Sequence, residues 1–526
     1  MVEVRYPSSI QTFSEIIRGG YLYVDKTELM WRLQRLDKYI FLSRPRRFGK
    51  TVLSTTFRSF FRGEKELFAG LKVTELEKEW TAYPVIHLNL STAKDKENNA
   101  VMQGELMRLL KPYAELYGSD DDEATPGARL AGLIERAYRI TGRQVVIIVD
   151  EYDAPLLEKL HGDELKETHR IMQEFYQPLK AYDEMIRFCF ITGITKFSQL
   201  SIFSTINNLT NVTMVPQFAT ICGFTDKDID SYFTEGIRTL AGTYRCSPEE
   251  MRQRLRDKYD SYHFAEDSEG VYNPFSLLKA FNLRKVDNYW FGSGTPSFLI
   301  RHLKHFNTDI TSLDHLEKPA DAFDLPTETM ETALPLLYQS GYLTIKSYDL
   351  DSGVYTLDFP NQEVRVGYAS GLLPAYAGLN GPSVQTGFAL KFWRALRGGD
   401  VELAMREMQS YFADIPYVEG FKEKLKEAVT AEGFYEYTMY LVFSMLNVYV
   451  RTQVKVAGGR ADMVVWMPDV TYVFELKKSG TAQQALEQID THSYALPYNT
   501  GCRRVVKVGV RFDPETRVPE SWAIAD

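Results

Sequence analysis

The sequence predicts a multidomain α/β protein, and three stretches support this prediction. A buried strand, a basic turn and a helix follow one another at residues 39–61. A run of β-branched residues at 144–153 ends in carboxylates, and strand-like segments at 448–477 bring acidic side chains near a lysine. A chain of 526 residues is too long for one hydrophobic core, so we expect about three domains.

The composition describes a folded protein without a general attraction to nucleic acid. Hydrophobic residues make up 44% of the chain and charged residues 25%, as in globular proteins, and the formal net charge is −9. Any contact with nucleic acid therefore has to come from a local groove. No apolar run reaches the ~18 residues that span a bilayer, and no signal-peptide core opens the chain. The four cysteines form no Cys-x-x-Cys pair. We expect a cytoplasmic protein with no membrane contact, and an oligomer is compatible with the sequence.

The first motif is the turn between the predicted strand Tyr39–Leu42 and the predicted helix Val52–Phe61. It ends in Gly49, Lys50 and Thr51, and the order strand, loop, helix is that of a P-loop. Backbone N–H groups of such a loop and the positive end of its helix point at one anion. We predict that Lys50 reaches the β- and γ-phosphates of ATP and that the Thr51 hydroxyl holds Mg²⁺.

The same turn departs from the common pattern at one position and leaves two roles open. The pattern has glycine six residues before the lysine, where this chain has Arg44. Arg46 and Arg47 are predicted either to contact phosphate, as arginine forks do, or to pair with local carboxylates. A basic surface turn before an ordinary helix is the competing explanation for the whole stretch.

The second motif is a strand whose carboxyl end carries two acidic residues. Val145–Val149 are five consecutive β-branched residues, which predicts a central parallel strand buried on both faces. In a P-loop ATPase, Asp150 would hold Mg²⁺ and Glu151 would orient or deprotonate the attacking water. The alternative is a strand that simply ends in a polar turn. A further strand from Ile186 ends near Thr192 and Thr195, either of which could contact the γ-phosphate.

The middle of the chain predicts two further units. Residues 225–283 have a charged helical pattern, which indicates a helical lid. A helix at Thr332–Ser340 precedes two alternating strands, Gly341–Lys346 and Val354–Phe359, which predicts a winged-helix-like unit. Because its ribbon is not basic, packing as a linker is favoured over DNA contact. The predicted domains are the P-loop domain at 1–224, the lid at 225–300, the winged-helix-like domain at 301–383 and a C-terminal α/β domain at 384–526.

The third motif is the acidic group near the C-terminus. Glu475 and Lys477 lie two apart on a predicted strand, so both side chains point to one face, and Asp462 lies on the neighbouring strand. Two carboxylates and the Leu476 carbonyl are oxygen ligands suited to Mg²⁺, and a lysine beside the metal can position water for attack on a phosphodiester. This is the Asp-x(n)-Glu-x-Lys arrangement of metal-dependent nucleases, although Glu-x-Lys alone is usually a solvated strand face.

Two helices flank this group and offer further candidates. Gln488, on the helix after the strands, could reach substrate backbone or water. Glu432 or Glu436, on the helix before them, could add a metal ligand; they are spaced i,i+4 on one face, so the sequence does not choose between them. The alternative for each is an exposed helix residue.

Taken together, these motifs resemble a bacterial family that joins an AAA-ATPase-like domain to a C-terminal PD-(D/E)XK nuclease-superfamily domain. The resemblance covers nearly the full length, and the family's phosphate loop also lacks the first glycine. Where the family commonly has proline before the first aspartate, this chain has Ala461. The motifs that carry the resemblance are Tyr23–Lys26, Leu42–Lys50, Asp150–Asp153, Thr192–Ser198, Asn207-Asn208, Ala219–Gly223, Asn273–Ser276, Asn288–Phe291, Gly459–Asp462, Phe474–Lys477, Ala485–Ile489 and Tyr494.

The resemblance implies an ATP-binding and ATP-hydrolysing switch coupled to a Mg²⁺-dependent nuclease that acts on nucleic acid. It implies ATPase positions at Lys50, Thr51, Asp150 and Glu151, and nuclease positions at Asp462, Glu475, Lys477 and Gln488. The alternative is an ATPase switch or scaffold whose nuclease-like domain is an inactive binding module. The choice between DNA and RNA stays open.

Overall fold

The computed structural model separates into two compact units. The N-terminal unit comprises Met1–Trp290 and Glu317–Asn361, and the C-terminal unit comprises Phe291–Leu316 and Gln362–Asp526. The residues that the structure describes are 4–94, 98–157, 159–160, 164–196, 209–291, 297–326, 329–377, 382–413, 431–446, 449–456, 458–467, 469–499, 503–513 and 518–526, and at 297–298, 373–377, 382–387, 389–390, 431–435 and 449 only the backbone is described.

A parallel sheet forms the centre of the N-terminal unit. Its strands are β1 (Tyr39–Ser43), β2 (Val85–Asn89), β3 (Val145–Asp150), β4 (Ile186–Gly193) and β5 (Leu209–Asn211), in the order β2-β3-β4-β1-β5. Every residue of β1 and β3 is buried, as expected for strands covered on both faces. The carboxyl ends of β1, β3 and β4 share one edge, which is where ligands bind in open α/β sheets.

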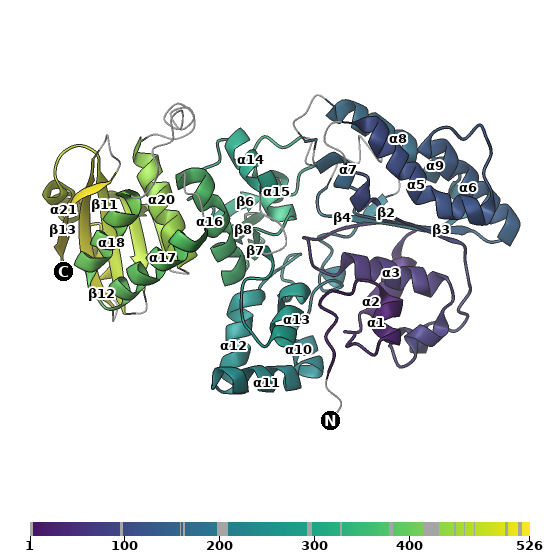
Figure 1. Ribbon diagram of the computed structural model, residues 1–526, viewed down its shortest axis with the longest axis horizontal. Helices are drawn as coiled ribbons and strands as arrows, with labels where there is room; N and C mark the ends of the chain where they lie inside the picture. The colour runs from purple at the N-terminus through teal and green to yellow at the C-terminus, as the bar shows by residue number, and fades with distance from the viewer. Residues whose placement is uncertain are drawn as a thin grey trace. The chain divides into compact units, whose positions relative to one another are not determined.

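Helices cover both faces of this sheet (Figure 1). Helix α3 (Lys50–Phe61) packs under β3 together with α1 and α2, and a second group of helices lies on the opposite face. The apolar residues of α3, among them Phe57 and Phe61, pack against Phe188 of β4. The other helices of this part of the chain are α1 (Phe13–Arg18), α2 (Thr27–Leu36), α4 (Val73–Leu76), α5 (Asn99–Tyr117), α6 (Pro126–Thr141), α7 (Ala154–Leu157), α8 (Leu165–Tyr176) and α9 (Pro178–Ala181).

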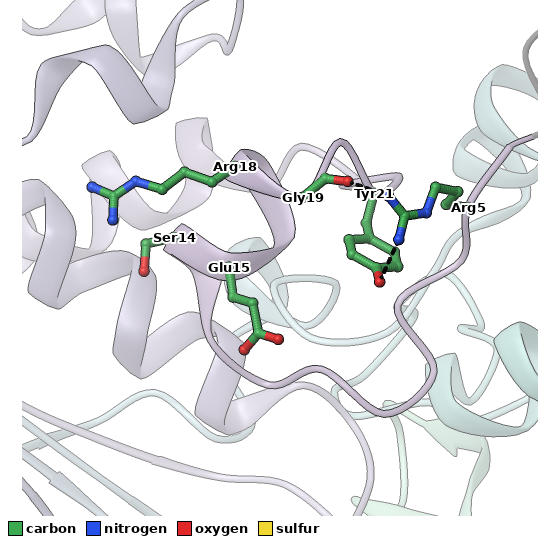
Figure 2. Close-up of a pocket in the computed structure, with 6 residues that line it drawn as sticks. All are labelled: Arg5, Ser14, Glu15, Arg18, Gly19 and Tyr21. Atoms are coloured by element: carbon green, nitrogen blue, oxygen red, sulfur yellow. Dashed lines mark hydrogen bonds between the residues drawn. The ribbon is translucent and has the colours of Figure 1, made fainter.

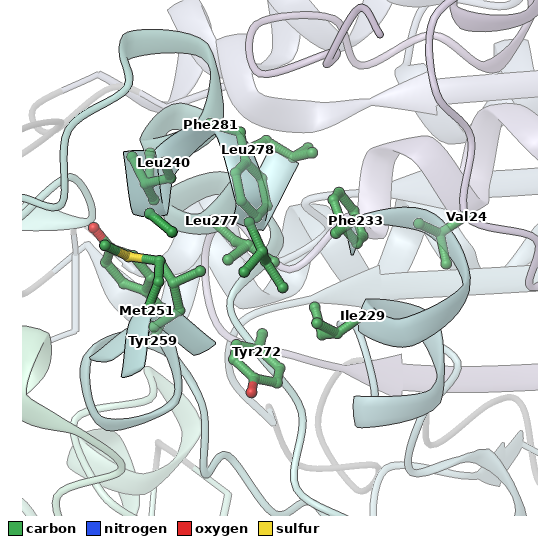
Figure 3. Close-up of a cluster of buried hydrophobic side chains, with 14 residues drawn as sticks. Val24, Ile229, Phe233, Leu240, Met251, Tyr259, Tyr272, Leu277, Leu278 and Phe281 are labelled. Atoms are coloured by element: carbon green, nitrogen blue, oxygen red, sulfur yellow. The ribbon is translucent and has the colours of Figure 1, made fainter. Parts of the chain in front are cut away.

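A four-helix group follows the sheet and has its own apolar core. Figure 3 shows this core, in which Phe233, Leu277 and Phe281 lie at the centre. Val24, from the segment before β1, inserts into the same cluster, so the helical group is anchored to the start of the sheet domain. The four helices are α10 (Asp226–Tyr232), α11 (Thr234–Tyr244), α12 (Pro248–Tyr259) and α13 (Pro274–Leu283).

The chain returns to the N-terminal unit as a small three-stranded sheet. Its order is β6-β8-β7, with β6 at Leu316–Pro319, β7 at Thr344–Asp349 and β8 at Val354–Asp358. The short helix α15 (Leu334–Gln339) precedes β7. The helix and the hairpin that the sequence predicts are therefore present, while the lid, the winged-helix assignment and the four domain boundaries stay predictions.

The C-terminal unit is built on a mixed sheet with the order β13-β12-β11-β10-β9. Strands β9 to β11 form an antiparallel meander, and β12 joins β11 in parallel after helix α21 (Ala482–Thr491). Helices α16 and α20 pack against each other in this unit (Figure 1). The elements are β9 (Tyr449–Val456), β10 (Gly459–Trp466), β11 (Val470–Lys477), β12 (Arg504–Phe512), β13 (Pro519–Ala525), α14 (Ser297–His305), α16 (Gln362–Ala377), α17 (Pro382–Arg397), α18 (Val401–Ala413) and α20 (Ala431–Met445).

Within the described ranges of both units, no helix combines the length and the apolar character needed to cross a membrane.

Candidate functional sites

The first candidate site is the loop between β1 and α3. Gly49 caps the helix with a left-handed φ of 86°, and Arg47 also has a positive φ of 70°. A Cβ added at Gly49 would meet no atom within 4 Å, so glycine is favoured there for its backbone angle rather than for space. Residues in such alternating conformations point consecutive N–H groups to one side, which makes an anion-binding concavity.

Lys50 begins α3 and is buried at the centre of this loop. Its ammonium donates hydrogen bonds to the carbonyls of Arg44 and Pro45, both at 2.9 Å. Burial lowers the pKa of Lys50, and the nearby carboxylates of Asp150, Asp153 and Glu151 partly raise it again. The lysine thus lies within the electrostatic field of the acidic end of β3.

Asp150 ends β3 and is fully buried. Its Oδ1 accepts the Glu151 N–H at 3.0 Å, whereas its Oδ2 has no hydrogen-bond partner in the described part of the chain. Burial raises the pKa of Asp150 to about 6, and a hydrogen bond with the Thr51 side chain lowers it in part. An unsatisfied buried carboxylate oxygen beside a threonine hydroxyl suits a Mg²⁺ ion that accompanies phosphate. Glu151 follows with a left-handed φ of 51° and is partly exposed.

Arg44 occupies the position of the missing glycine, but its side chain lies inside the protein. The guanidinium donates to the carbonyls of Ser43, Thr213 and Phe218 at 2.9, 2.8 and 3.2 Å. It also lies 4.2 Å from the centre of the Phe264 ring, and burial lowers its pKa to about 10. Arg44 therefore fixes the base of the loop to the segment after β5.

Arg46 and Arg47 differ from Arg44 because both side chains are exposed. Arg47 stacks over the Phe275 ring at 4.4 Å. Neither arginine has an ion pair with a carboxylate among the described residues, so the local pairing left open by the sequence is not seen there.

The two threonines at the end of β4 serve the local structure. The Thr192 hydroxyl donates to the Leu42 carbonyl at 2.7 Å. The Thr195 hydroxyl donates to Asp153 Oδ2 at 2.7 Å, and the N–H groups of Ile194 and Thr195 donate to the same oxygen at 2.9 and 2.7 Å. No role for Asp153 was predicted from the sequence. The available signal was its position two residues after the Asp150-Glu151 pair at the end of a predicted buried strand.

The second candidate site lies on β10 and β11 of the C-terminal unit. The Leu476 N–H donates to Asp462 Oδ2 at 2.8 Å, which joins the two strands. The Lys477 ammonium lies 3.2 Å from Glu475 Oε1 and 2.5 Å from Gln488 Oε1 on α21. The structure therefore brings these sequence-predicted residues together.

Glu475 is buried, and its Oε2 has no hydrogen-bond partner in the described chain. Burial and, to a lesser degree, the Asp462 carboxylate raise the pKa of Glu475 to about 7, against the opposing effect of Lys477. The negative charges of the Glu475 and Asp462 carboxylates repel each other, and a divalent cation bound between them would stabilise both in the ionised form.

Glu436 joins this group from α20. Its Oε2 accepts a hydrogen bond from Gln453 Nε2 at 2.9 Å, and its Oε1 has no partner among the described residues. Burial raises the pKa of Glu436 to about 7, and Asp462 contributes to the increase. The side chain of Glu432 lies outside the described residues, so the structure places only Glu436.

Gln453 is a residue of this site that the sequence analysis missed. It has a left-handed φ of 52° inside β9 and lies opposite Asp462, between the pairs Val454–Ala461 and Thr452–Met463. Non-glycine residues held in this left-handed region carry backbone strain, and such residues cluster at functional sites. No local signal marked it, because Arg451, Thr452 and Lys455 on the same strand are polar as well.

The donor set fits a magnesium ion chemically: carboxylates of Asp462, Glu475 and Glu436, two of which have an unpartnered buried oxygen. As they are placed, however, no three His, Cys, Asp or Glu side chains of the described ranges are close enough together to hold a metal ion. A bound ion would therefore require the side chains, or Lys477, to shift.

A surface hollow of about 530 Å³ lies apart from these residues, near the N-terminus (Figure 2). Arg5 in its wall donates to the Gly19 carbonyl at 2.9 Å and to the Tyr21 hydroxyl at 2.8 Å. Its guanidinium is used in these contacts. The lining residues are Arg5, Ser14, Glu15, Arg18, Gly19 and Tyr21.

Comparison with known proteins identifies one domain near each end of the chain. Residues 7–203 match the family model described as "Predicted AAA-ATPase", and residues 430–522 match that of the PD-(D/E)XK nuclease superfamily. An uncharacterized protein in the vnfD 5' region of Azotobacter chroococcum mcd 1 is 31% identical over 535 residues, which covers 98% of each chain. No solved structure matches. The chain thus belongs to the family of proteins that combine a predicted AAA-ATPase domain with a C-terminal domain of the PD-(D/E)XK nuclease superfamily.

Proposed function

We propose that this protein is an ATP-binding and ATP-hydrolysing switch coupled to a Mg²⁺-dependent nuclease that cleaves phosphodiester bonds of nucleic acid. One observation carries the proposal. In each candidate site a lysine stands beside a buried carboxylate, Asp150 or Glu475, that has an oxygen without a hydrogen-bond partner in the described chain. Such atoms are costly unless a ligand or ion completes them.

In the first site, the loop N–H groups and Lys50 would bind the phosphates of ATP. The Lys50 ammonium would exchange the carbonyls of Arg44 and Pro45 for phosphate oxygens. Mg²⁺ held through Thr51 and Asp150 would supply charge neutralisation at the phosphates. Glu151 would orient the attacking water and accept its proton, and the exposed Arg46 and Arg47 would contact phosphate.

In the second site, Asp462, Glu475, Glu436 and the Leu476 carbonyl would hold Mg²⁺, which supplies Lewis-acid stabilisation of the phosphodiester. Lys477 would steady the charge that develops on the phosphate and position the attacking water. Gln488 would hold the Lys477 ammonium in place, as its 2.5 Å contact suggests.

Nucleotide binding tests the first site. We expect Lys50→Ala to reduce the affinity for a fluorescent ATP analogue by at least 100-fold, because the loop loses its buried cation. Lys111→Ala is the control, since Lys111 is exposed and pairs only weakly with Glu115 at 3.9 Å. Equal affinity of Lys50→Ala and the wild type would mean that the nucleotide site is misassigned.

Cleavage assays test the second site. Plasmid DNA, single-stranded DNA and RNA are incubated with Mg²⁺ or Mn²⁺, with and without ATP. We expect cleavage by the wild type and by Asp490→Ala, whose exposed carboxylate pairs with Lys507, but none by Asp462→Ala. Cleavage that persists in Asp462→Ala would refute the assignment.

The second candidate function is an ATPase switch whose nuclease-like domain is an inactive binding module. The observation that favours it is that the described carboxylates do not form a ready metal site. Binding of nucleic acid without cleavage under every condition would support this function over the first.

A further inference from the structure

The Asn288–Phe291 motif has no part in either site, yet it ends where the chain passes from one unit to the other. Trp290 is the last residue of the first part of the N-terminal unit, and Phe291 is the first residue of the C-terminal unit. Each of these two neighbours is held by contacts within its own unit.

In the N-terminal unit, Trp290 holds the phosphate loop. Its buried indole N–H donates to the Arg46 carbonyl at 3.1 Å, and its ring packs edge-on against Tyr342 at 5.3 Å. The two preceding carbonyls of the loop, of Arg44 and Pro45, accept hydrogen bonds from Lys50. Three consecutive peptide planes are thus fixed, two by the lysine and one by the tryptophan.

The loop is also enclosed by rings on its outer side. Phe48 packs edge-on against Tyr262 and Phe264, with ring centres at 4.6 and 5.3 Å. Pro45 lies so near Gly341 that a Cβ there would stand 2.6 Å from the proline ring. A loop enclosed in this way cannot rearrange without displacing its neighbours.

In the C-terminal unit, Phe291 holds helix α16. A Cβ added at Gly367 would lie 1.8 Å from the Phe291 ring, so the ring lies directly on the helix backbone. One planar peptide unit joins Trp290 to Phe291, so the two anchored residues are covalent neighbours whose Cα atoms stay about 3.8 Å apart.

Helix α16 is in turn bonded to α20, the helix that carries Glu436. Asp314 accepts an ion pair from Arg365 of α16 and a 2.9 Å hydrogen bond from the hydroxyl of Tyr440 on α20. Tyr440 is fully buried and lies one helical turn beyond Glu436. A shift of α16 would therefore move the helix that presents a carboxylate to the second candidate site.

We propose that the Trp290–Phe291 pair is the mechanical link by which nucleotide binding acts on the nuclease-like site. On nucleotide binding, Lys50 would release the Arg44 and Pro45 carbonyls, and the neighbouring Arg46 carbonyl would reorient. Trp290, which is bonded to that carbonyl, would then move together with Phe291. The movement of Phe291 would shift α16 and, through it, α20. This inference rests on the proposed nucleotide site and specifies how that site regulates the other. Trp290 and Phe291 are positioning residues and touch no substrate.

Hydrogen–deuterium exchange of the full-length protein tests the link without any measurement of catalysis. Exchange is measured at 362–377 (α16) and 431–445 (α20), with and without a non-hydrolysable ATP analogue at a concentration that saturates each variant. We expect the analogue to change exchange at least twofold in both helices of the wild type and of Trp522→Phe. This control also loses an indole hydrogen bond, the 2.7 Å bond to Glu402.

Two variants separate the steps. Trp290→Phe removes the bond to Arg46, so the response is lost in both helices. Tyr440→Phe removes only the hydroxyl that meets Asp314, so the response is reduced at least twofold in α20 and kept in α16. Analogue binding by the wild type without a change in α16, or an unaltered response in Trp290→Phe, would overturn the link. Failure of the wild type to bind the analogue would instead reject the proposed nucleotide site, so the two failures are distinguishable.

Discussion

Replacing Arg44 with glycine would restore the residue that the common phosphate-loop pattern has at this position. We nevertheless expect Arg44→Gly to destabilise the N-terminal unit. The guanidinium makes three hydrogen bonds of 2.8–3.2 Å to buried carbonyls, and each bond with a charged partner contributes about 1.5–3 kcal/mol. The three together contribute roughly 5–9 kcal/mol.

Part of this stabilisation is offset by the cost of burying the charge. Burial lowers the pKa of Arg44 from 12.5 to about 10, which corresponds to about 3 kcal/mol that the substitution would relieve. The expected net loss in the free energy of unfolding is therefore about 2–6 kcal/mol.

The measurement is urea-induced unfolding followed by circular dichroism and tryptophan fluorescence. Arg46→Gly is the matched control, because Arg46 is exposed on the same loop and its loss should change the free energy by less than about 1 kcal/mol. A wild-type urea midpoint for Arg44→Gly would show that the buried guanidinium does not support the loop.

Three further predictions concern stability and pH. Burial lowers the pKa of His87 from 6.5 to about 4. The unfolded chain therefore binds a proton below pH 6.5 and the folded chain only below about 4, so the free energy of unfolding should fall by about 1–3 kcal/mol as the pH drops through this window. Acid titration of His87→Gln should show a smaller fall in the free energy of unfolding. In thermal unfolding, Gly341→Ala should lower the free energy of unfolding by about 1–3 kcal/mol more than Gly353→Ala does. Both glycines have a positive φ, but only Gly341 lies against Pro45. Equal losses of free energy in the two variants would mean that the contact with Pro45 is unimportant. Because burial raises the pKa of Glu475 to about 7, Mg²⁺ binding should release protons near pH 6.5 and weaken as the pH falls, and calorimetry in two buffers should find less proton release in Glu475→Gln.

Local sequence patterns predicted the elements that carry chemistry because each obeys a simple periodicity. The β-branched run at 145–149 could only be a buried strand, and β3 covers Val145–Asp150. Strand-like composition likewise predicted β9, β10 and β11, and the two-residue spacing predicted that Glu475 and Lys477 share one strand face, where they lie 3.2 Å apart.

Features that depend on contacts between distant residues were beyond such patterns. The partners of Arg44 lie some 170 positions away at Thr213 and Phe218, and no local signal indicates them. The left-handed backbone of Gln453 arises where two strands meet. Periodicity also does not encode the strand order β2-β3-β4-β1-β5, because each parallel strand looks alike in sequence.

The discontinuity of the N-terminal unit has a practical consequence for dissecting this protein. A fragment that stops at Trp290 would lack Gly341 and Tyr342, which pack on Pro45 and Trp290. A fragment that starts at Gln362 would lack Asp314, the partner of Arg365 and Tyr440. Neither unit can be cut out at a single position with its packing intact, so the two candidate sites are better separated by point substitutions than by truncation.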